Sequence, residues 1–586
     1  PKTDVANNTN KNEAATVDMT EEEMATYYNI TKEELNVKEV LNDVFFIAVP
    51  QENADGRYHN IRTNALGFDL NRDNTYQTQN ETQAMTHLIA KWNPVSFHEI
   101  HGFYTQYQVE PCSPVHEPNV EYDIFMDLGL AQGEAFGAAS IVNNDTINSF
   151  NTPMRDYLFV DEDGNKNWVP FDDMSTSYTP QYALTHGAYA YTVELPYASA
   201  DAAKATAYGF VGNAAFVAEN KEAFMLNQLT VYYRGVNNID AEEIDPWYVS
   251  QSDEIGKEAD MFRPVYEENN NFFPEYYVIP VDVENQQDIQ AVNDMVEWLL
   301  RNDVRVKRLT ADVTVNGVEY KAGTVIVDMH QAKRNVANAA LYNNLVIDTW
   351  TDLYSEPVTN FSDLRGFDMD IITKAGAFEA SKMENVTEGL NLTTVITGKG
   401  QVSVIANNSV HAVKAINELL AAGVQVGYIT EGEFKGDFVV ATEDLGTVVE
   451  DYILVVNQSN TVPAAKVITE TPTIYVPGRK ATYQTSGGRE MGVKDYLVML
   501  DTTYAWDIFA YGTQLGFELT YDATKADIIV GAKGLSAKEI ELVYGALKAA
   551  KPDEKIVQLL SEALLIKPLC AKLLINRGYT DVESAR

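Results

Sequence analysis

The sequence has little positive charge. Its 586 residues include 43 Lys and Arg against 85 Asp and Glu, which gives a formal net charge of −42 at pH 7. Phosphate binding needs clustered lysines and arginines, so this balance argues against a nucleic acid as partner. Anionic membrane surfaces attract basic segments and are excluded for the same reason. We expect a strongly acidic, well-solvated exterior.

Cysteine and long apolar runs are also scarce. The two cysteines, Cys112 and Cys570, lie far apart, which excludes a disulfide framework and a zinc-finger spacing. No apolar run approaches the length that crosses a membrane, and no signal-peptide pattern follows Pro1. The polar start PKTDVANNTNKNEAA indicates the interior of a longer precursor, so the compartment cannot be read from the ends.

What is present is typical of a folded protein with several domains. Hydrophobic residues make up 45% and aromatic residues 11% of the chain, and its length predicts two to four domains. The apolar run 43–50 predicts a buried strand, 80–94 an amphipathic helix, and 95–103 and 188–197 two more strands. Residues 199–230 predict helix. Strand and helix alternate again over 275–310 and 401–430, which predicts further α/β units.

Polar side chains occur within the expected strands. His98, Glu99 and His101 fall in VSFHEIHGF, and Glu194 falls in the apolar run YTVEL. Successive strand residues point to opposite faces, so Glu99 and His101 share a face whereas His98 and His101 do not, and these two histidines are not expected to share a metal. Two interpretations stay open. These side chains are structural polar groups satisfied at strand ends, or they are functional, since an unpaired carboxylate on an apolar strand is costly.

Four segments together resemble the M14 family of zinc carboxypeptidases in order and approximate spacing. They are FFIAVPQENADGR, IRTNALGFDLNRD, FHEIHGF and YAYTVELP. The family's Asn-Pro-Asp-Gly turn is matched by residues 53–56, where alanine replaces proline. An arginine ahead of a Gly-x-Asp-Leu-Asn-Arg run is matched by Arg62, then Asn71 and Arg72.

The resemblance extends to the catalytic groups. The family's third zinc ligand, a histidine two residues after an acidic residue on a strand, is matched by His101 after Glu99. Its catalytic glutamate, on a late strand of Thr-x-x-Glu-Leu type, is matched by Glu194. The family also uses a mobile tyrosine upstream of that glutamate, for which Tyr178 is our candidate and Tyr182 the alternative.

The resemblance implies a role for most residues of the stretch 53–74, which has three arginines and five asparagines. Asn71 and Arg72 would bind the terminal carboxylate of a peptide, since a guanidinium group donates two parallel hydrogen bonds to a carboxylate. Arg62 would polarise the scissile carbonyl. Glu194 would deprotonate a zinc-bound water and pass the proton to the leaving amine. Arg57 has no matched role.

The sequence departs from the family in its first zinc ligands. The family's His-x-x-Glu motif precedes the Asn-Pro-Asp-Gly turn, but residues 1–52 contain no histidine. Catalytic zinc needs three protein ligands, and neither spacing nor family supports His98, Glu99 or His116 as substitutes. Either the ligands lie on a preceding segment of the same precursor, or the protein is a metal-free relative. Zinc is expected for the family, yet this chain alone is expected to be inactive.

We therefore predict an α/β fold. An incomplete M14-like mixed sheet with helices on both faces spans 1–235, an α/β linking domain 236–385, an amidotransferase-like α/β domain 386–555, and a helical tail 556–586. The third region resembles domains appended to large bacterial M14 proteins. It has no cysteine at a strand-helix elbow, so no catalysis is expected there. KPLCAKLLINRGYTDVESA resembles the start of RecJ-type exonucleases, without their Asp-His-His chemistry.

By resemblance, the protein would be secreted or held at the cell surface and would hydrolyse C-terminal residues of peptides. The alternative is a non-catalytic extracellular binding or surface protein on the same fold.

Overall fold

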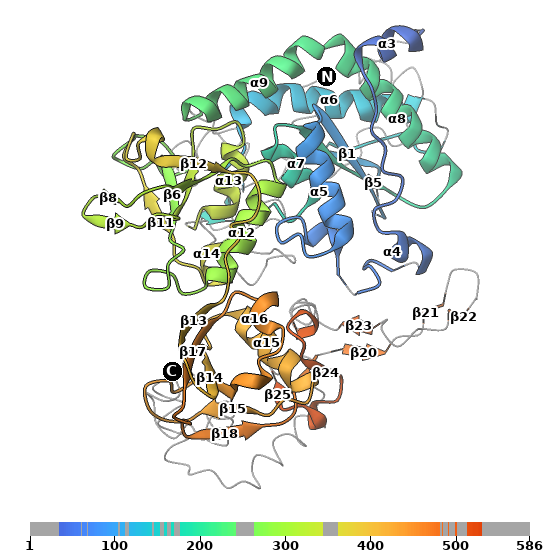
Figure 1. Ribbon diagram of the computed structural model, residues 1–586. Coiled ribbons are helices and arrows are strands. Elements are labelled where there is room, and N and C mark those ends of the chain that lie inside the picture. Colours follow the sequence, from blue (N-terminus) through green and yellow to red (C-terminus); the bar gives the residue numbers. More distant parts are fainter. Residues whose placement is uncertain are drawn as a thin grey trace. The chain divides into compact units, whose positions relative to one another are not determined.

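The computed structural model describes most of the chain between residues 34 and 529. The described residues are 34–59, 61–66, 68–103, 106–111, 117–142, 144, 146–152, 158–160, 166–168, 176–241, 263–343, 361–476, 478–480, 483–484, 490–491, 498–500 and 512–529. Cys112, His116, Cys570 and the expected helical tail 556–586 lie outside them. Helices with mixed, parallel and antiparallel sheets confirm the predicted α/β class (Figure 1).

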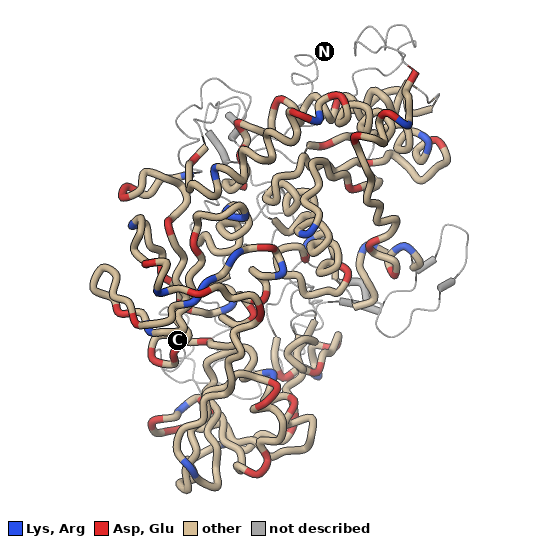
Figure 2. Tube along the Cα trace, turned by 45° about the horizontal axis from the view of Figure 1, so that its top comes forward, with Lys and Arg blue, Asp and Glu red and all other residues tan. Residues whose placement is uncertain are grey.

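The chain divides into two compact units. The first comprises Pro1–Ala54 and Asp69–Leu392, and the second comprises Asp55–Phe68 and Thr393–Arg586. Acidic residues are spread along the elements of both units (Figure 2). Among the described helices, none combines the length and the apolar composition that crossing a membrane requires.

The part of the first unit up to residue 241 is built around one small sheet. Its elements are α3 (Val37–Asp43), η1 (Leu70–Arg72), α5 (Asn80–Trp92), β1 (Ser96–Gly102), β2 (Gln108–Pro111), α6 (Tyr122–Val142), β3 (Leu158–Val160), β4 (Lys166–Trp168), α7 (Thr179–Thr185), β5 (Tyr189–Leu195), α8 (Ala200–Glu219) and α9 (Lys221–Asn237). The strand order is β1-β5-β2, with β1 parallel and β2 antiparallel to β5. Helices α6, α8 and α9 lie on one side of the sheet and α5 on the other (Figure 1).

Most local expectations hold in this part. The amphipathic helix is α5, which buries Met85, Ile89 and Ala90. It ends where Asn93 turns left-handed with φ 45°, just before Pro94. The strands expected over 95–103 and 188–197 are β1 and β5. The expected helical stretch is α8 and α9, separated at Asn220.

The expectation of a buried strand over 43–50 is wrong. Residues 44–50 form neither helix nor strand. Phe45 is 70% exposed, Phe46 53% and Val49 44%. An apolar run becomes a buried strand only where neighbouring strands pair with it and layers cover it. None of the described strands pairs with this segment.

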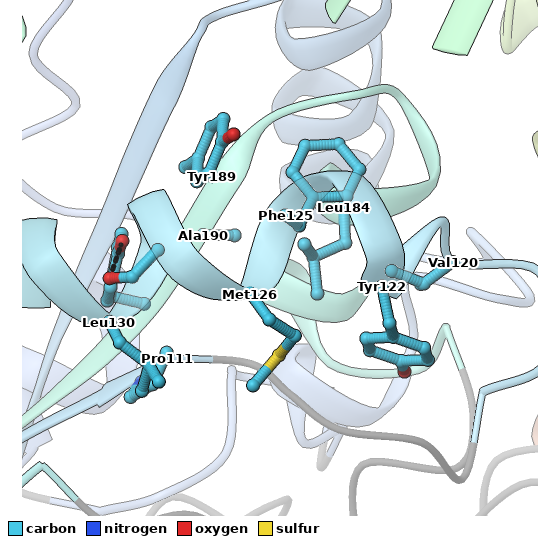
Figure 3. A pocket seen from close by; sticks show the side chains of 11 residues that line it. Pro111, Val120, Tyr122, Phe125, Met126, Leu130, Leu184, Tyr189 and Ala190 are labelled. Carbon is cyan, nitrogen blue, oxygen red and sulfur yellow. Dashed lines mark hydrogen bonds between the residues drawn. The ribbon is translucent and has the colours of Figure 1, made fainter. Parts of the chain in front are cut away.

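Helices α6 and α8 approach closely through small residues. A Cβ added to Gly212 would lie 2.3 Å from Ala139 Cβ and 3.1 Å from the backbone oxygen of Ala135. Gly129 of α6 is different, because an added Cβ would come no closer than 3.6 Å to the Tyr189 ring. Gly129 also borders an apolar cavity of about 20 Å³ between α6 and β5 (Figure 3), which is too small for a peptide.

Gly212→Ala is expected to lower the free energy of unfolding by about 1–3 kcal/mol, because the two helices must separate to admit the methyl group. Gly129→Ala is expected to raise it by up to about 1 kcal/mol, because alanine favours helix and the methyl group has room. Urea denaturation of both variants measures the difference. Effects of the same sign would contradict this account of the packing.

The remainder of the first unit forms an antiparallel sheet with helices. Its elements are β6 (Tyr276–Ile279), α12 (Ile289–Arg301), β7 (Val306–Leu309), β8 (Val313–Val315), β9 (Val318–Tyr320), β10 (Val325–Asp328), α13 (Arg334–Leu341), α14 (Phe361–Arg365), β11 (Asp370–Ile372), η3 (Ala380–Lys382) and β12 (Met383–Val386). The strand order is β11-β6-β10-β7-β12. The expected strand-helix-strand run over 275–310 is β6, α12 and β7, and β10 lies between the two strands.

The second unit contains a mixed sheet with the order β13-β17-β14-β16-β15-β18. Its elements are β13 (Val395–Gly398), β14 (Val402–Ile405), α15 (Val410–Ala421), β15 (Val426–Ile429), β16 (Phe438–Ala441), η4 (Thr442–Asp444), α16 (Val448–Asp451), β17 (Val455–Ser459), β18 (Ala465–Ile468), β19 (Thr473–Tyr475), β20 (Gly478–Lys480), β21 (Tyr483–Gln484), β22 (Glu490–Met491), β23 (Val498–Leu500), β24 (Glu518–Thr520), η5 (Ala523–Lys525) and β25 (Ile528–Ile529). Helix α4 (Ala54–His59) begins at the boundary between the units. The expected strand-helix-strand run over 401–430 is β14, α15 and β15.

Candidate functional site

His101 and Glu194 meet at the ends of two parallel strands. In the register of β1 and β5, His101 lies opposite Glu194 and Gly102 opposite Leu195. Paired residues of neighbouring strands project from the same face of a sheet. His101 Nε2 lies 2.9 Å from Glu99 Oε1, and His101 Nδ1 lies 3.7 Å from Glu194 Oε1. One imidazole therefore stands between two carboxylates at the carboxyl edge of the sheet.

His98 lies on the opposite face, as strand alternation predicts. Its ring stacks between Phe136 at 4.7 Å and Tyr191 at 4.5 Å, measured between ring centroids. Burial lowers the pKa of His98 to about 3, so the ring is neutral at physiological pH. His98 is therefore part of the packing against α6 rather than of the His101 cluster.

Asn71 and Arg72 lie beside Tyr178, although Tyr178 follows them by more than 100 residues in the chain. Asn71 Oδ1 accepts hydrogen bonds from Thr179 N at 2.9 Å and Thr179 Oγ1 at 3.2 Å. The Arg72 guanidinium carbon lies 4.0 Å from the centroid of the Tyr178 ring. Arg72 Nη1 donates to the backbone oxygen of Asn71 at 2.9 Å, and a guanidinium group carries further N–H donors in its plane. Such a group can bind a planar carboxylate.

The backbone around these residues is held by buried side chains. Asn74 Nδ2 donates to Ser177 O at 2.9 Å and to Thr179 Oγ1 at 3.1 Å. Asp73 accepts from the Gln79 backbone N–H at 2.9 Å and from Thr78 Oγ1 at 2.7 Å. Burial raises the pKa of Asp73 to about 6, although these hydrogen bonds oppose the rise. The loop after Arg72 is therefore ordered by contacts of its own.

The two tyrosine candidates differ in burial and in their contacts. Tyr178 is half-buried beside Arg72. Tyr182 is fully buried, and its hydroxyl bonds Asn302 Oδ1. Burial raises the pKa of Tyr182 well above its ordinary value. A tyrosine held in this way cannot swing to meet a substrate, so Tyr178 is the better candidate.

Glu52 is a candidate functional residue that the sequence reasoning missed. Its pKa is raised to about 8, first by burial and then by the charges of Glu99 and Glu81, with a smaller increase from Asp73 and an opposing effect of His101. Its Oε1 is buried and has no hydrogen-bond partner among the described residues. Glu52 thus interacts electrostatically with the His101 cluster and with the loop that follows Arg72. The sequence feature that could have indicated Glu52 is its position as an acidic residue just after the apolar run 43–50.

The remaining candidates belong to the second unit. Arg57 and Arg62 lie in Asp55–Phe68, which groups with the second unit, so the place of Arg62 beside Asn71 and Arg72 stays a prediction. Hydrogen bonds within that segment order it, including Asp55 Oδ2 accepting from Ala65 N at 3.2 Å.

The side chains that the structure describes do not fit a zinc site. Within the part of the chain that the structure describes, no group of three His, Cys, Asp or Glu side chains is arranged to hold a metal ion. His101 remains the credible ligand, and its two nitrogens face Glu99 and Glu194. Catalytic zinc takes three protein ligands and an open position, so no hydrolytic step can be derived from these side chains.

Comparison with known proteins gives no relative from which function can be transferred. No protein-family model matches the chain, and neither a curated protein nor a solved structure matches it significantly.

Proposed function

We propose that this protein binds the free C-terminus of peptides through a carboxypeptidase-like site in its first unit. The observation that carries the proposal is the Arg72 guanidinium group, 4.0 Å above the Tyr178 ring and next to Asn71. A half-buried, pre-oriented guanidinium group is suited to binding a carboxylate. The chain has a net charge of −42, so few other basic residues compete with Arg72 for the carboxylate of a peptide.

The His101 and Glu194 pair supports a hydrolytic version of this function. In that version the protein is a zinc metallocarboxypeptidase of M14 type that removes C-terminal residues. It needs two zinc ligands beyond the described residues, and without them the protein is inactive. The second candidate is a non-catalytic extracellular binding or surface protein, which the poor fit of the described residues to zinc favours.

Peptide binding tests the proposal. A short peptide with a free C-terminus is expected to bind roughly tenfold more tightly than its C-terminal amide, because only the acid forms charge-assisted hydrogen bonds with Arg72. Added salt should narrow this difference, since the pair is partly exposed. Isothermal titration of both peptides at two salt concentrations measures the ratio.

Three variants test whether the preference for the free acid depends on Arg72. Arg72→Ala should bring the two affinities together, and Arg72→Lys should restore only part of the preference because lysine has no planar fork. Arg308→Ala is the matched control. It removes the same charge from an exposed pair with Glu384 in the same unit, and it should leave the ratio unchanged. Equal binding of acid and amide by the unaltered protein would exclude the proposed function.

Metal content distinguishes the two versions. We expect the dialysed chain to hold well under one zinc ion per molecule, because the described residues offer His101 without two further ligands. Elemental analysis after dialysis against a weak chelator measures it. One tightly held zinc per chain would instead favour the hydrolytic version and would require ligands outside the described residues.

A further inference from the structure

The last turn of α12 contacts both segments that carry the proposed carboxylate-binding residues. Residues 71–79 carry Arg72, and the start of α7 carries Tyr178. Both belong to the part of the first unit before residue 241, whereas α12 belongs to the part after residue 263. The contacts between them lie within one compact unit.

Asn302, the residue that ends α12, is fully buried. Its amide forms a reciprocal pair with the Gln77 amide, in which Gln77 Nε2 donates to Asn302 Oδ1 at 2.8 Å and Asn302 Nδ2 donates to Gln77 Oε1 at 3.1 Å. The same Asn302 Oδ1 accepts from the Tyr182 hydroxyl. One side chain therefore bonds the Arg72 loop and helix α7 together.

Neighbours of Asn302 reinforce the contact with the loop. Trp298 Nε1 donates to Thr75 O at 2.8 Å, and Arg301 Nε donates to Gln77 Oε1 at 3.0 Å. Gln77 itself is 2% exposed and has a left-handed φ of 56°, a conformation that non-glycine residues adopt only when their surroundings hold them. Contacts with α12 therefore stabilise the loop conformation after Arg72, in addition to the hydrogen bonds within the loop itself.

The contact with α7 acts on Tyr178. Tyr178 caps the start of α7, and the Tyr182 backbone N–H donates to Tyr178 O at 2.9 Å, one helical turn later. Fixing the Tyr182 hydroxyl therefore fixes the turn from which Tyr178 projects. The Asn74 amide also donates hydrogen bonds to Ser177 and Thr179, the two neighbours of Tyr178 in the chain. These bonds join the Arg72 loop directly to the start of α7.

We propose that Asn302 is a positioning residue, which sets the distance between Arg72 and Tyr178 by bonding Gln77 and Tyr182 at once. The region 263–392 is then an integral part of the carboxylate-binding site rather than an appended domain. The functional consequence rests on the proposed function, whereas the structural linkage does not.

Amide hydrogen exchange tests the linkage without any ligand. Asn302→Ala should speed exchange over both 71–79 and 176–186, because it leaves the Gln77 amide and the Tyr182 hydroxyl without their shared partner. Tyr182→Phe should speed exchange over 176–186 alone. Asn293→Ala is the matched control on α12, since the Asn293 amide bonds Glu297 and Leu390 instead, and it should affect neither segment.

Peptide binding tests the positioning role. Asn302→Ala should reduce the preference for the free acid over the amide by roughly threefold or more, as expected for a residue coupled to the binding groups. A merely structural role would alter stability and leave this ratio intact. Asn302→Asp retains the acceptor for Tyr182 and Gln77 but loses the Nδ2 donor to Gln77 Oε1 and Trp298 O, so it should restore only part of the preference.

The outcomes separate the two proposals. If the unaltered protein does not prefer the acid, the proposed function fails and the exchange data still decide the linkage. If Asn302→Ala does not fold, hydrogen exchange of Tyr182→Phe and Asn302→Asp tests the linkage instead. A folded Asn302→Ala variant with unchanged exchange in both segments overturns the linkage. A preference that is unchanged in that variant overturns the positioning role.

Discussion

Glu121→Gln is expected to lower the free energy of unfolding of the first unit by about 3–5 kcal/mol, because it leaves the buried Arg334 guanidinium group without its carboxylate partner. It also removes one of the two carboxylates that Arg234 contacts, the other being Asp123. Glu121 Oε1 lies 3.0 Å from Arg334 Nη2, and the side chains of both residues are fully buried. Glu121 Oε2 lies 2.8 Å from Arg234 Nη1. Burial alone would raise the pKa of Glu121, but the guanidinium groups of Arg263, Arg334 and Arg234 outweigh it and hold the pKa below its ordinary value. The carboxyl is therefore ionised at neutral pH.

Chemical denaturation at pH 7, followed by tryptophan fluorescence, measures this loss. Glu384→Gln is the control, since it breaks an exposed pair with Arg308 and should change stability little. Adding Arg334→Met to Glu121→Gln should recover part of the loss, because one uncompensated charge is then removed as well. A Glu121→Gln variant as stable as the unaltered protein would mean that the buried cluster contributes no net stability.

Glu52→Gln is expected to stabilise the protein at alkaline pH and to leave it unchanged at low pH. The folded pKa of Glu52 is about 8 and its ordinary value is 4.5. Below the ordinary pKa, the folded and unfolded states both hold the proton, so burial of the carboxyl carries no charge penalty. Between the two values the folded state alone holds the proton, so the free energy of unfolding falls as pH rises and levels off above about 8.

Glu52→Gln removes the cost of burying an ionised carboxylate, because the amide of glutamine does not titrate. Its advantage should grow from near zero at pH 4 to at most about 5 kcal/mol above pH 8, given about 1.4 kcal/mol for each unit of the difference between 4.5 and about 8. Urea denaturation across this range, in the presence of a chelator, measures the difference. An advantage that does not vary with pH would show that the pKa of Glu52 is the same in the folded and the unfolded protein.

Local rules account for the part of the site on the strands. Alternation along β1 is enough to place Glu99 with His101 and to send His98 to the other face. The structure agrees, since His101 contacts Glu99 while His98 stacks on Phe136. These features depend on neighbours one or two residues away. The parallel pairing of β1 with β5, which brings Glu194 near His101, is shown by the structure alone.

Other features depended on partners that no local pattern specifies. Residues 44–50 have the composition of a buried strand, yet whether such a run is buried depends on strands and layers supplied elsewhere. The raised pKa of Glu52 comes from burial and from charges at Glu99, Glu81 and Asp73, which are distant in sequence.

The amino-acid sequence by itself determined the α/β class, the positions of α5, β1 and β5, and the residue types available for carboxylate recognition, because these follow from periodicity and side-chain chemistry. Only the tertiary structure decided that Arg72 stacks on Tyr178, that Tyr182 is buried, and that Asn302 joins the two segments. The physical reason is that these contacts join residues more than 100 positions apart. Bringing these segments together costs conformational entropy. The contacts therefore form only when the packing of α12 against the Arg72 loop and α7 offsets that cost.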